Sequence, residues 1–152
     1  MRFSTKGEYA ILALLELALH NGRGPLQART ISKNQRISLR FLEQVLSMIK
    51  KSGLVDSVRG AQGGYILAKP PSEIRMGDVL EAIEGPITPI SCVSGGIEPH
   101  CWHEAELGHC VMKEIGEEVK SSIQEALNST TLQDMCERKK EKEQQKVLMY
   151  HI

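Results

Sequence analysis

Residues 38–67 read SLRFLEQVLSMIKKSGLVDSVRGAQGGYIL, and this stretch predicts a helix followed by a β-hairpin. Ser38 is a residue type favoured at helix N-caps, and the apolar residues after it recur at helical spacing until Gly53. Two short β-prone runs then flank the glycine-rich turn at 59–64. A short helix is also predicted at 28–33. The order of short helix, turn, amphipathic helix and hairpin is that of a winged helix-turn-helix.

The polar side of the helix predicted at 38–51 carries side chains that suit the major groove of DNA. Arg40 can donate to guanine O6 and N7, Gln44 can pair with adenine, and Glu43 can accept from cytosine N4. Because phosphates repel a carboxylate elsewhere in the groove, we expect Glu43 to penalise wrong sequences. Arg59 at the hairpin turn suits a narrow minor groove, where the negative potential is greatest. The predicted DNA-binding residues are Ser38, Arg40, Glu43, Gln44, Ser47, Arg59, Gly60 and Gln62. An ordinary surface helix with a charged face is the alternative interpretation.

The distribution of charge supports a nucleic-acid partner, although the formal net charge of the 152 residues is zero. Residues 1–70 hold eleven Lys or Arg against four Asp or Glu, a net charge of +7. Residues 71–152 hold eight against fifteen, a net charge of −7. Such asymmetry is expected where the basic half binds an anionic polymer. The composition, 41% apolar and only 4% aromatic, predicts a globular protein with an aliphatic core.

Further helices are predicted on both sides of the central stretch. An N-terminal helix runs to about His20, and Thr5 and Glu8 have the spacing of a capping box at its start. A short amphipathic helix follows residue 72 and ends at Gly85-Pro86. The fold class is therefore mainly α with a small β-hairpin.

A long helix is predicted from about residue 104, with apolar residues in a row at i+4 spacing. Little of the chain is left to pack on this row, so a second copy of the chain is the natural partner and a homodimer is expected. A last helix starts at Thr131 or Asn128, and 138–146 is predicted to be a solvated run of mixed charge. The row consists of Val111, Ile115, Val119, Ile123 and Leu127.

Three parts of the chain are expected to differ in role. Residues 1–71 form the DNA-binding winged helix-turn-helix, and residues 72–103 hold the short helix and a loop that bears cysteines. Residues 104–152 form the long C-terminal dimerisation helix and a C-terminal helix or tail.

Cys92, Cys101 and Cys110 are separated by eight residues each, and three thiolates from one loop suit a soft metal or an iron–sulfur cluster. The spacing lacks the CxxC pairs of a zinc ribbon. A Cys₃His zinc site and three free thiols are the alternatives, and His100, His103 and His109 lie among the cysteines and could supply a nitrogen ligand. Cys136 is distant and is expected to be an ordinary thiol, either in the core or on the surface.

The N-terminal apolar run is too short to span a bilayer and is bracketed by Glu8 and Glu16, so it predicts neither a signal peptide nor a membrane span. We expect a cytoplasmic protein whose cysteines stay reduced. The sequence contains no Walker A motif, no dinucleotide-binding motif and no pairing of nucleophile and base, so an enzyme is not expected. An electron-transfer or enzyme module remains the alternative to a DNA-binding protein.

The chain resembles the IscR/NsrR/CymR type of bacterial winged-helix regulators. The motifs that carry the resemblance are MRFSTKG at 1–7, the helix at 38–44, RGAQGGY at 59–65 and the stretch from Asp78 to Pro86. The resemblance implies a homodimer, joined through the long helix, on a pseudo-palindromic operator. It also implies a 2Fe–2S or 4Fe–4S cluster in members with three cysteines, and control of sulfur metabolism in the CymR type, which lacks them.

The sequence departs from the IscR pattern at two points. The cysteine intervals are eight residues instead of five, and Lys113 stands where IscR has its histidine ligand. The candidates for a fourth ligand are His103, His109, or Glu8 reaching across the dimer. The leading hypothesis is an iron–sulfur-sensing regulator of cluster-biogenesis genes with a 2Fe–2S cluster. A nitric-oxide or redox-responsive repressor, a regulator of cysteine metabolism and a zinc-binding regulator are the alternatives.

Overall fold

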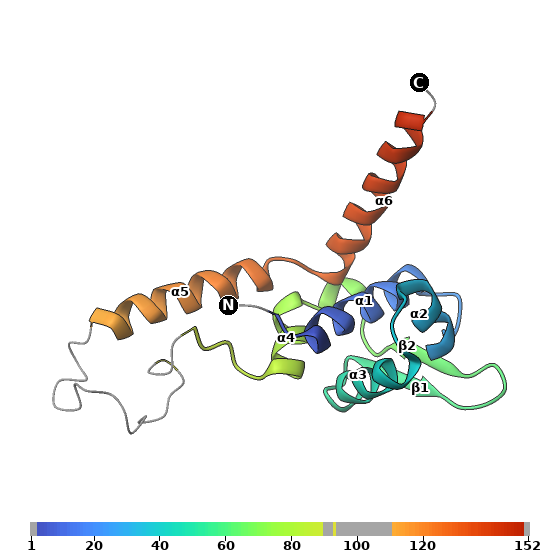
Figure 1. The fold of residues 1–152 in the computed structure, drawn as a ribbon, viewed down its shortest axis with the longest axis horizontal. Helices are drawn as coiled ribbons and strands as arrows, with labels where there is room; N and C mark the ends of the chain where they lie inside the picture. Colours follow the sequence, from blue (N-terminus) through green and yellow to red (C-terminus); the bar gives the residue numbers. More distant parts are fainter. Residues whose placement is uncertain (1–2, 90–92, 94–110, 151–152) are drawn as a thin grey trace.

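The computed structural model of the chain describes residues 3–89, residue 93 and residues 111–150, the last four by their backbone alone. Figure 1 shows the elements in chain order. They are α1 (Thr5–Leu19), α2 (Ala28–Gln35), α3 (Leu39–Lys51), β1 (Val55–Val58), β2 (Gly64–Leu67), a 3₁₀ turn (Pro71–Glu73), α4 (Met76–Glu84), α5 (Val111–Asn128) and α6 (Leu132–Tyr150). The described residues confirm the prediction of a mainly helical fold with a small hairpin.

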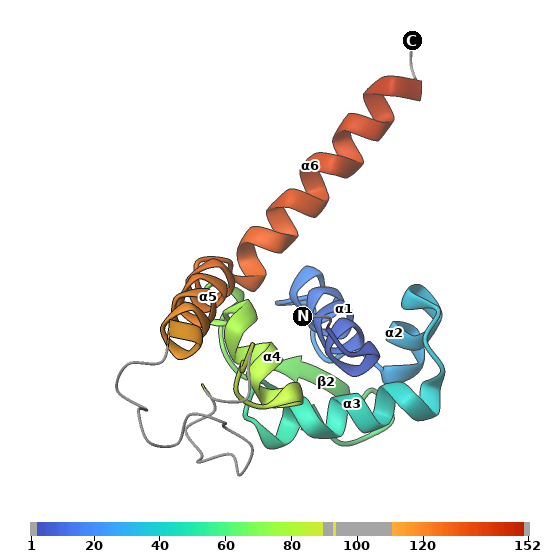
Figure 2. The ribbon, with the colours of Figure 1, turned by 60° about the vertical axis from the view of Figure 1, so that its left-hand side comes forward.

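The first four helices and the hairpin form one body, and α5 and α6 extend away from it in different directions (Figures 1 and 2). Strands β1 and β2 pair antiparallel, with Val55 opposite Leu67 and Val58 opposite Gly64. Helix α3 lies below α1 in Figure 1. The hairpin follows α3 in the chain. The predicted winged helix-turn-helix order is therefore present in the body.

The core is aliphatic, as the low aromatic content predicts. Helix α1 buries residues on several sides and contacts α2, α3, α4, α6 and β2. Leu14 of α1 and Leu46 of α3 are completely buried, and so are Val79 of α4 and Leu132 of α6. Each large aliphatic side chain buried in this way contributes roughly 1.5–3 kcal/mol to the stability of the fold. The core thus joins residues from both the basic and the acidic half of the chain.

The start of α1 differs from the capping box expected between Thr5 and Glu8. Ser4 is the N-cap, and its hydroxyl oxygen accepts from the backbone N–H of Gly7 at 3.1 Å. Thr5 is the first helical residue, so Glu8 does not occupy the third position, where a capping carboxylate would lie. The backbone N–H of Ser4 donates instead to Glu84 Oε1 of α4, at 2.8 Å. The prediction was wrong because Ser4 offers a capping hydroxyl one residue earlier.

The turn between α5 and α6 is fixed to the start of α4 by backbone hydrogen bonds. The N–H of Leu132 donates to the carbonyl of Ile74 at 2.8 Å, and that of Met76 donates to the carbonyl of Thr130 at 3.0 Å. Thr131 is the cap of α6, one of the two residues proposed for this role. The predicted solvated run at 138–146 is part of α6, because Glu, Lys, Arg and Gln are all good helix formers.

Asp134 completes the cap of α6 by bonding back to Thr131. Its Oδ2 accepts from the backbone N–H of Thr131 at 2.8 Å and from the hydroxyl of Thr131 at 2.7 Å. The N–H of Asp134 donates in turn to the Thr131 hydroxyl oxygen at 3.2 Å. Both hydrogen bonds from Thr131 lower the pKa of Asp134 below its ordinary value, and the bond from the backbone N–H has the larger effect.

We expect Asp134→Asn to destabilise the protein at neutral pH but not in strong acid. A carboxyl whose pKa is lower in the folded state stabilises the fold above its ordinary pKa, and this contribution is lost as the pH falls through the folded pKa. Urea unfolding followed by circular dichroism at several pH values measures the difference. Glu141→Gln makes the same chemical change at an exposed position of α6 and serves as the control. A difference between wild type and Asp134→Asn that persists at strongly acidic pH would contradict this account.

Candidate nucleic-acid interface

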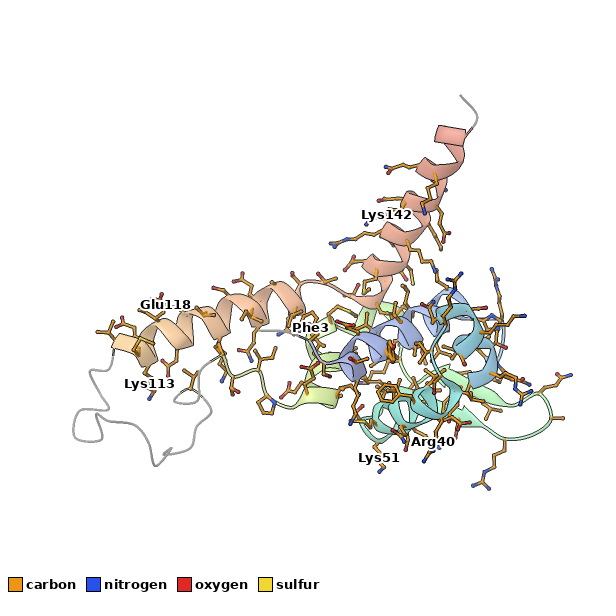
Figure 3. The ribbon with its side chains drawn as sticks, in the orientation of Figure 1. Phe3, Arg40, Lys51, Lys113, Glu118 and Lys142 are labelled. Atoms are coloured by element: carbon orange, nitrogen blue, oxygen red, sulfur yellow. The ribbon has the colours of Figure 1, made fainter. Side chains whose placement is uncertain are left out.

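Helix α3 divides its side chains sharply between the core and solvent. Leu42, Val45, Leu46 and Ile49 are completely buried. The predicted base-reading residues lie on the other side and are all exposed: Arg40, Glu43, Gln44 and Ser47. Figure 3 shows Arg40 and Lys51 on the outer side of α3, on the side of the body away from α6. The helix therefore presents a continuous polar face of the length that fits a major groove.

Ser38 caps α3 and remains exposed. Its hydroxyl oxygen accepts from the backbone N–H of Phe41 at 3.4 Å. The hydroxyl proton is not used in this bond, so it stays able to donate to a phosphate oxygen. Phosphates bind favourably at helix N-termini because the free backbone N–H groups point at them.

The turn before α3 holds the helix at its angle to α2. Arg36 adopts a left-handed conformation, with φ 55°, and it is the one residue other than glycine with positive φ in the described part of the chain. The hydroxyl of Ser32 donates to the carbonyl of Ile37 at 2.6 Å across this turn. Glu16 of α1 accepts from the side-chain amides of Gln35 and Asn34, at 2.6 and 3.1 Å. The sequence predicted a turn between these two helices, but neither the left-handed Arg36 nor these hydrogen bonds, because the turn contains no glycine or proline that would signal its conformation.

The wing turn exposes the three predicted contact residues Arg59, Gly60 and Gln62. The N–H of Gly63 donates to the carbonyl of Gly60 at 3.0 Å and closes the turn. A Cβ atom at Gly63 would collide with the backbone carbonyl of Val58, so the tight return requires glycine. The side chain of Arg59 has no hydrogen-bond or ion-pair partner in the described residues, so the guanidinium is available to a nucleic acid.

A bridge that the sequence analysis missed holds the hairpin against the body. Leu26 pairs with Tyr65, each donating its N–H to the other's carbonyl at 2.9 Å. The backbone of Leu26 also passes so close to Gly64 that a side chain there would collide with it. The side chain of Lys50 at the end of α3 donates to the Ser57 hydroxyl of β1. These contacts fix the position of the hairpin, the predicted wing, relative to α3, the predicted recognition helix.

Additional basic side chains surround the predicted contacts. Two lie at the end of α3 and three on or just after α2, and all are exposed: Lys50, Lys51, Arg29, Lys33 and Arg36. The sequence analysis did not single them out, although the net charge of +7 in the first half of the chain contains them. Lysine and arginine near a groove contact phosphates and add affinity without sequence preference.

The predicted metal ligands fall mostly outside the described residues. Cys92, Cys101, Cys110, His103 and His109 all lie there. In the described ranges, no group of three or more His, Cys, Asp or Glu side chains could hold a metal ion.

Glu8 is the one described candidate for the fourth ligand. It is exposed in the first turn of α1, and its carboxylate has no hydrogen-bond or ion-pair partner among the residues that the structure describes. Cys136 is 4% exposed, and burial raises the pKa of its thiol. Cys136 is therefore a core residue, one of the two roles expected for it.

Comparison with known proteins identifies the family. The family model Rrf2, described as an iron-dependent transcriptional regulator, matches residues 3–138. The chain belongs to the Rrf2 family. The winged helix-turn-helix of this chain is accordingly a DNA-binding unit, and the chain is a transcriptional regulator and not an enzyme. Within the described residues, no helix combines the length and the hydropathy needed to cross a membrane.

Relatives of two named kinds are similar over most of the chain. The transcriptional regulator CymR of Bacillus subtilis is 35% identical over 136 residues, which are 90% of each chain. Its solved structure, described as that of the global cysteine regulator, matches with a TM-score of 0.74 over 91% of this Rrf2 protein and 98% of CymR. IscR of Serratia proteamaculans is 38% identical over 135 residues, 89% of this chain and 79% of IscR. The solved IscR of T. potens is 39% identical, with a TM-score of 0.72 over 91% of this chain and 88% of that one.

We expect Arg59→Ala to weaken DNA binding without loss of folding. Removing one arginine from a groove costs roughly 1–3 kcal/mol, which is about 5- to 150-fold in affinity. Fluorescence anisotropy with a duplex selected in vitro by the wild-type protein measures the effect. Arg138→Ala removes the same side chain from an exposed position of α6, away from the recognition helix, and should leave the affinity unchanged. Equal affinities for wild type and Arg59→Ala would exclude the wing from the interface.

Proposed function

We propose that this Rrf2-family regulator is a homodimer that senses an iron–sulfur cluster and controls genes of cluster biogenesis. The observation that carries the proposal is the set of three evenly spaced cysteines, Cys92, Cys101 and Cys110, between the DNA-binding body and α5. Thiolates are the ligands that iron–sulfur clusters use. The relatives named IscR and the iron-dependent description of the family support this assignment. We place the regulator in the cytoplasm, where its DNA would be.

The chemistry of the donor set fits a 2Fe–2S cluster, and a 4Fe–4S cluster uses the same ligands. Three of the four ligands would be the cysteines, and the fourth would be His103, His109 or the partner copy's Glu8. The structure supports Glu8 as a candidate because Ser4 and Glu84 satisfy the start of α1 without it. Its carboxylate is exposed and has no competing partner in the part of the chain that the structure describes.

The apolar row of α5 supports dimerisation. Val111, Met112, Ile115 and Val119 are 63, 60, 48 and 42% exposed, whereas Leu127 at the other end of the helix packs against the core. Helix α5 projects from the body in Figure 1, so its N-terminal half lies away from the core that α1 to α4 form. A second copy that lays the same row against this one would bury these side chains and bring two recognition helices onto one operator.

In this mechanism the exposed face of α3 reads base edges, and Ser38 and the surrounding lysines and arginines hold the phosphate backbone. Arg59 enters the minor groove, and Glu43 discriminates against sites that lack cytosine at its position. The cluster, when bound, would cross-link the three thiolates and so order the chain between α4 and α5. The state of that segment would then change which operators the dimer binds.

A cysteine-metabolism regulator is the second candidate, favoured by the similarity to CymR in sequence and in structure. If the protein is a cysteine-metabolism regulator, the three cysteines would carry no cluster. A nitric-oxide or redox-responsive repressor would use the same cysteines and lose operator binding when the cluster reacts. A zinc-binding regulator would hold the metal with the same thiolates and one histidine.

We expect protein purified without oxygen to be coloured and to contain iron and acid-labile sulfide in equal amounts. Alanine at Cys92, Cys101 or Cys110 should abolish the colour, because each removes a ligand. Cys136→Ala removes a thiol from the core and serves as the matched control that keeps the cluster. Colourless protein with stoichiometric zinc would overturn the proposal in favour of a zinc regulator, and metal-free protein would favour the cysteine regulator.

We expect Ile115→Glu to convert the dimer to a monomer, because it places a charge in the middle of the apolar row. Ser121→Glu adds the same charge to an exposed position of α5 outside the row and should leave the dimer intact. Sedimentation analysis measures the mass of each variant. A dimer that survives Ile115→Glu would exclude this face of α5 as the interface.

A further inference from the structure

The side chain of Glu84 joins the end of α4 to the beginning of α1. Its Oε1 accepts from the backbone N–H of Ser4 at 2.8 Å, across 80 residues of sequence. Ser4 is itself the N-cap of α1 and accepts from the N–H of Gly7. A carboxylate at this end of a helix is also favoured by the helix dipole. The first turn of α1 is thus positioned by a residue of α4.

The packing around this contact requires glycine at position 7. Gly7 is buried, and a Cβ atom there would collide with the carboxylate of Glu84 and lie 3.2 Å from the Leu80 side chain. Phe3 and the chain that leaves α4, Gly85 to Thr88, line one hollow of about 200 Å³ with Leu80 and Glu84. Figure 3 shows Phe3 close to α4 and the start of α1. The start of the chain at Phe3 and the segment that follows α4 are therefore in contact, so a shift of one would displace the other.

The next turn of α1 touches the recognition helix. The ring of Tyr9 packs edge-on against that of Phe41, with centroids 5.5 Å apart and planes at 85°. Phe41 lies between Arg40 and Leu42 in α3, and its N–H donates to the cap residue Ser38. This aromatic contact is one of the contacts by which a displacement at the start of α1 would act on the predicted base-reading face of α3.

We propose that Glu84 is a positioning residue that relays the state of the segment following α4 to the recognition helix. The relay runs from Glu84 to Ser4 and Gly7, then through Tyr9 to Phe41. Only seven residues separate Glu84 from Cys92, so a change in the cysteine-bearing segment would act directly on Gly85 and on the carboxylate before it. This inference rests on the proposed function, because it takes the cysteine segment to be the sensor.

Glu84→Ala tests the relay, with Glu81→Ala as its matched control. Glu81 is exposed on the same helix, and its side chain has no partner among the described residues. Operator affinity is measured for cluster-bound and cluster-free protein, on a duplex selected in vitro by the wild type. We expect the two wild-type affinities to differ by roughly 5–150-fold, the usual range of coupling between sites. The ratio should fall to about one in Glu84→Ala and stay at the wild-type value in Glu81→Ala.

A second measurement needs no cluster. If the segment and the recognition helix are coupled, DNA must also change the segment, since coupling is reciprocal. Alkylation of Cys92 by iodoacetamide, followed by mass spectrometry on cluster-free protein, should change in rate by about fivefold when the duplex is added. The change should be absent in Glu84→Ala, and Glu84→Gln should retain part of it because the amide oxygen can still accept from Ser4.

The outcomes separate the relay from the proposed function. A wild-type protein that binds no cluster, but whose Cys92 responds to DNA only when Glu84 is present, would refute the cluster and support the relay. A Glu84→Ala protein that keeps the wild-type affinity ratio or the wild-type change in alkylation would overturn the relay. So would a wild-type Cys92 whose alkylation ignores DNA.

Discussion

Helix α1 imposes the constraint on which the rest of the structure depends. From Ala10 to Leu15 it contains only aliphatic residues, so no side of this stretch can face water without cost. The recognition helix, the short helix before it, α4, the start of α6 and the second strand of the wing all contact α1. Packing against α1 therefore sets the orientation of the elements that are predicted to contact DNA. A displacement of α1 is consequently a displacement of the interface.

The same helix carries a different chemistry at each end. Its N-terminal turn is held by Glu84 and presents Glu8 to solvent. Near its C-terminal end, Glu16 binds the amides of Asn34 and Gln35 and so fixes the turn that leads to α3. These two contacts have distinct consequences, because the second ties α1 to the DNA-binding side and the first ties it to the side from which the cysteine segment leaves.

The zero net charge of the chain is the sum of a basic first half and an acidic second half, and the fold places these charges on different elements. Most of the basic residues of the first half lie on or next to α2, α3 and the wing, where they are exposed. The acidic excess of the second half lies on α4, α5 and α6 and in the segment between α4 and α5. Yet Ile74, Val79 and Leu132 of the acidic half are completely buried in the same core as Leu14 and Leu46. Charge separates the two halves at the surface, and hydrophobic burial unites them inside.

The sequence by itself determined the elements and their order. Periodicity in 38–51, the cap at Ser38, the glycines of the wing and the stop at Gly85 are local signals, because each depends on residues within one element or next to it. The three cysteines are likewise visible as a pattern, although the structure does not describe them. What only the tertiary structure decided are the contacts between distant residues: the Leu26–Tyr65 bridge, the Tyr9–Phe41 packing and the bond from Ser4 to Glu84. No local pattern encodes these contacts, because each depends on how helices that are far apart in sequence pack around α1.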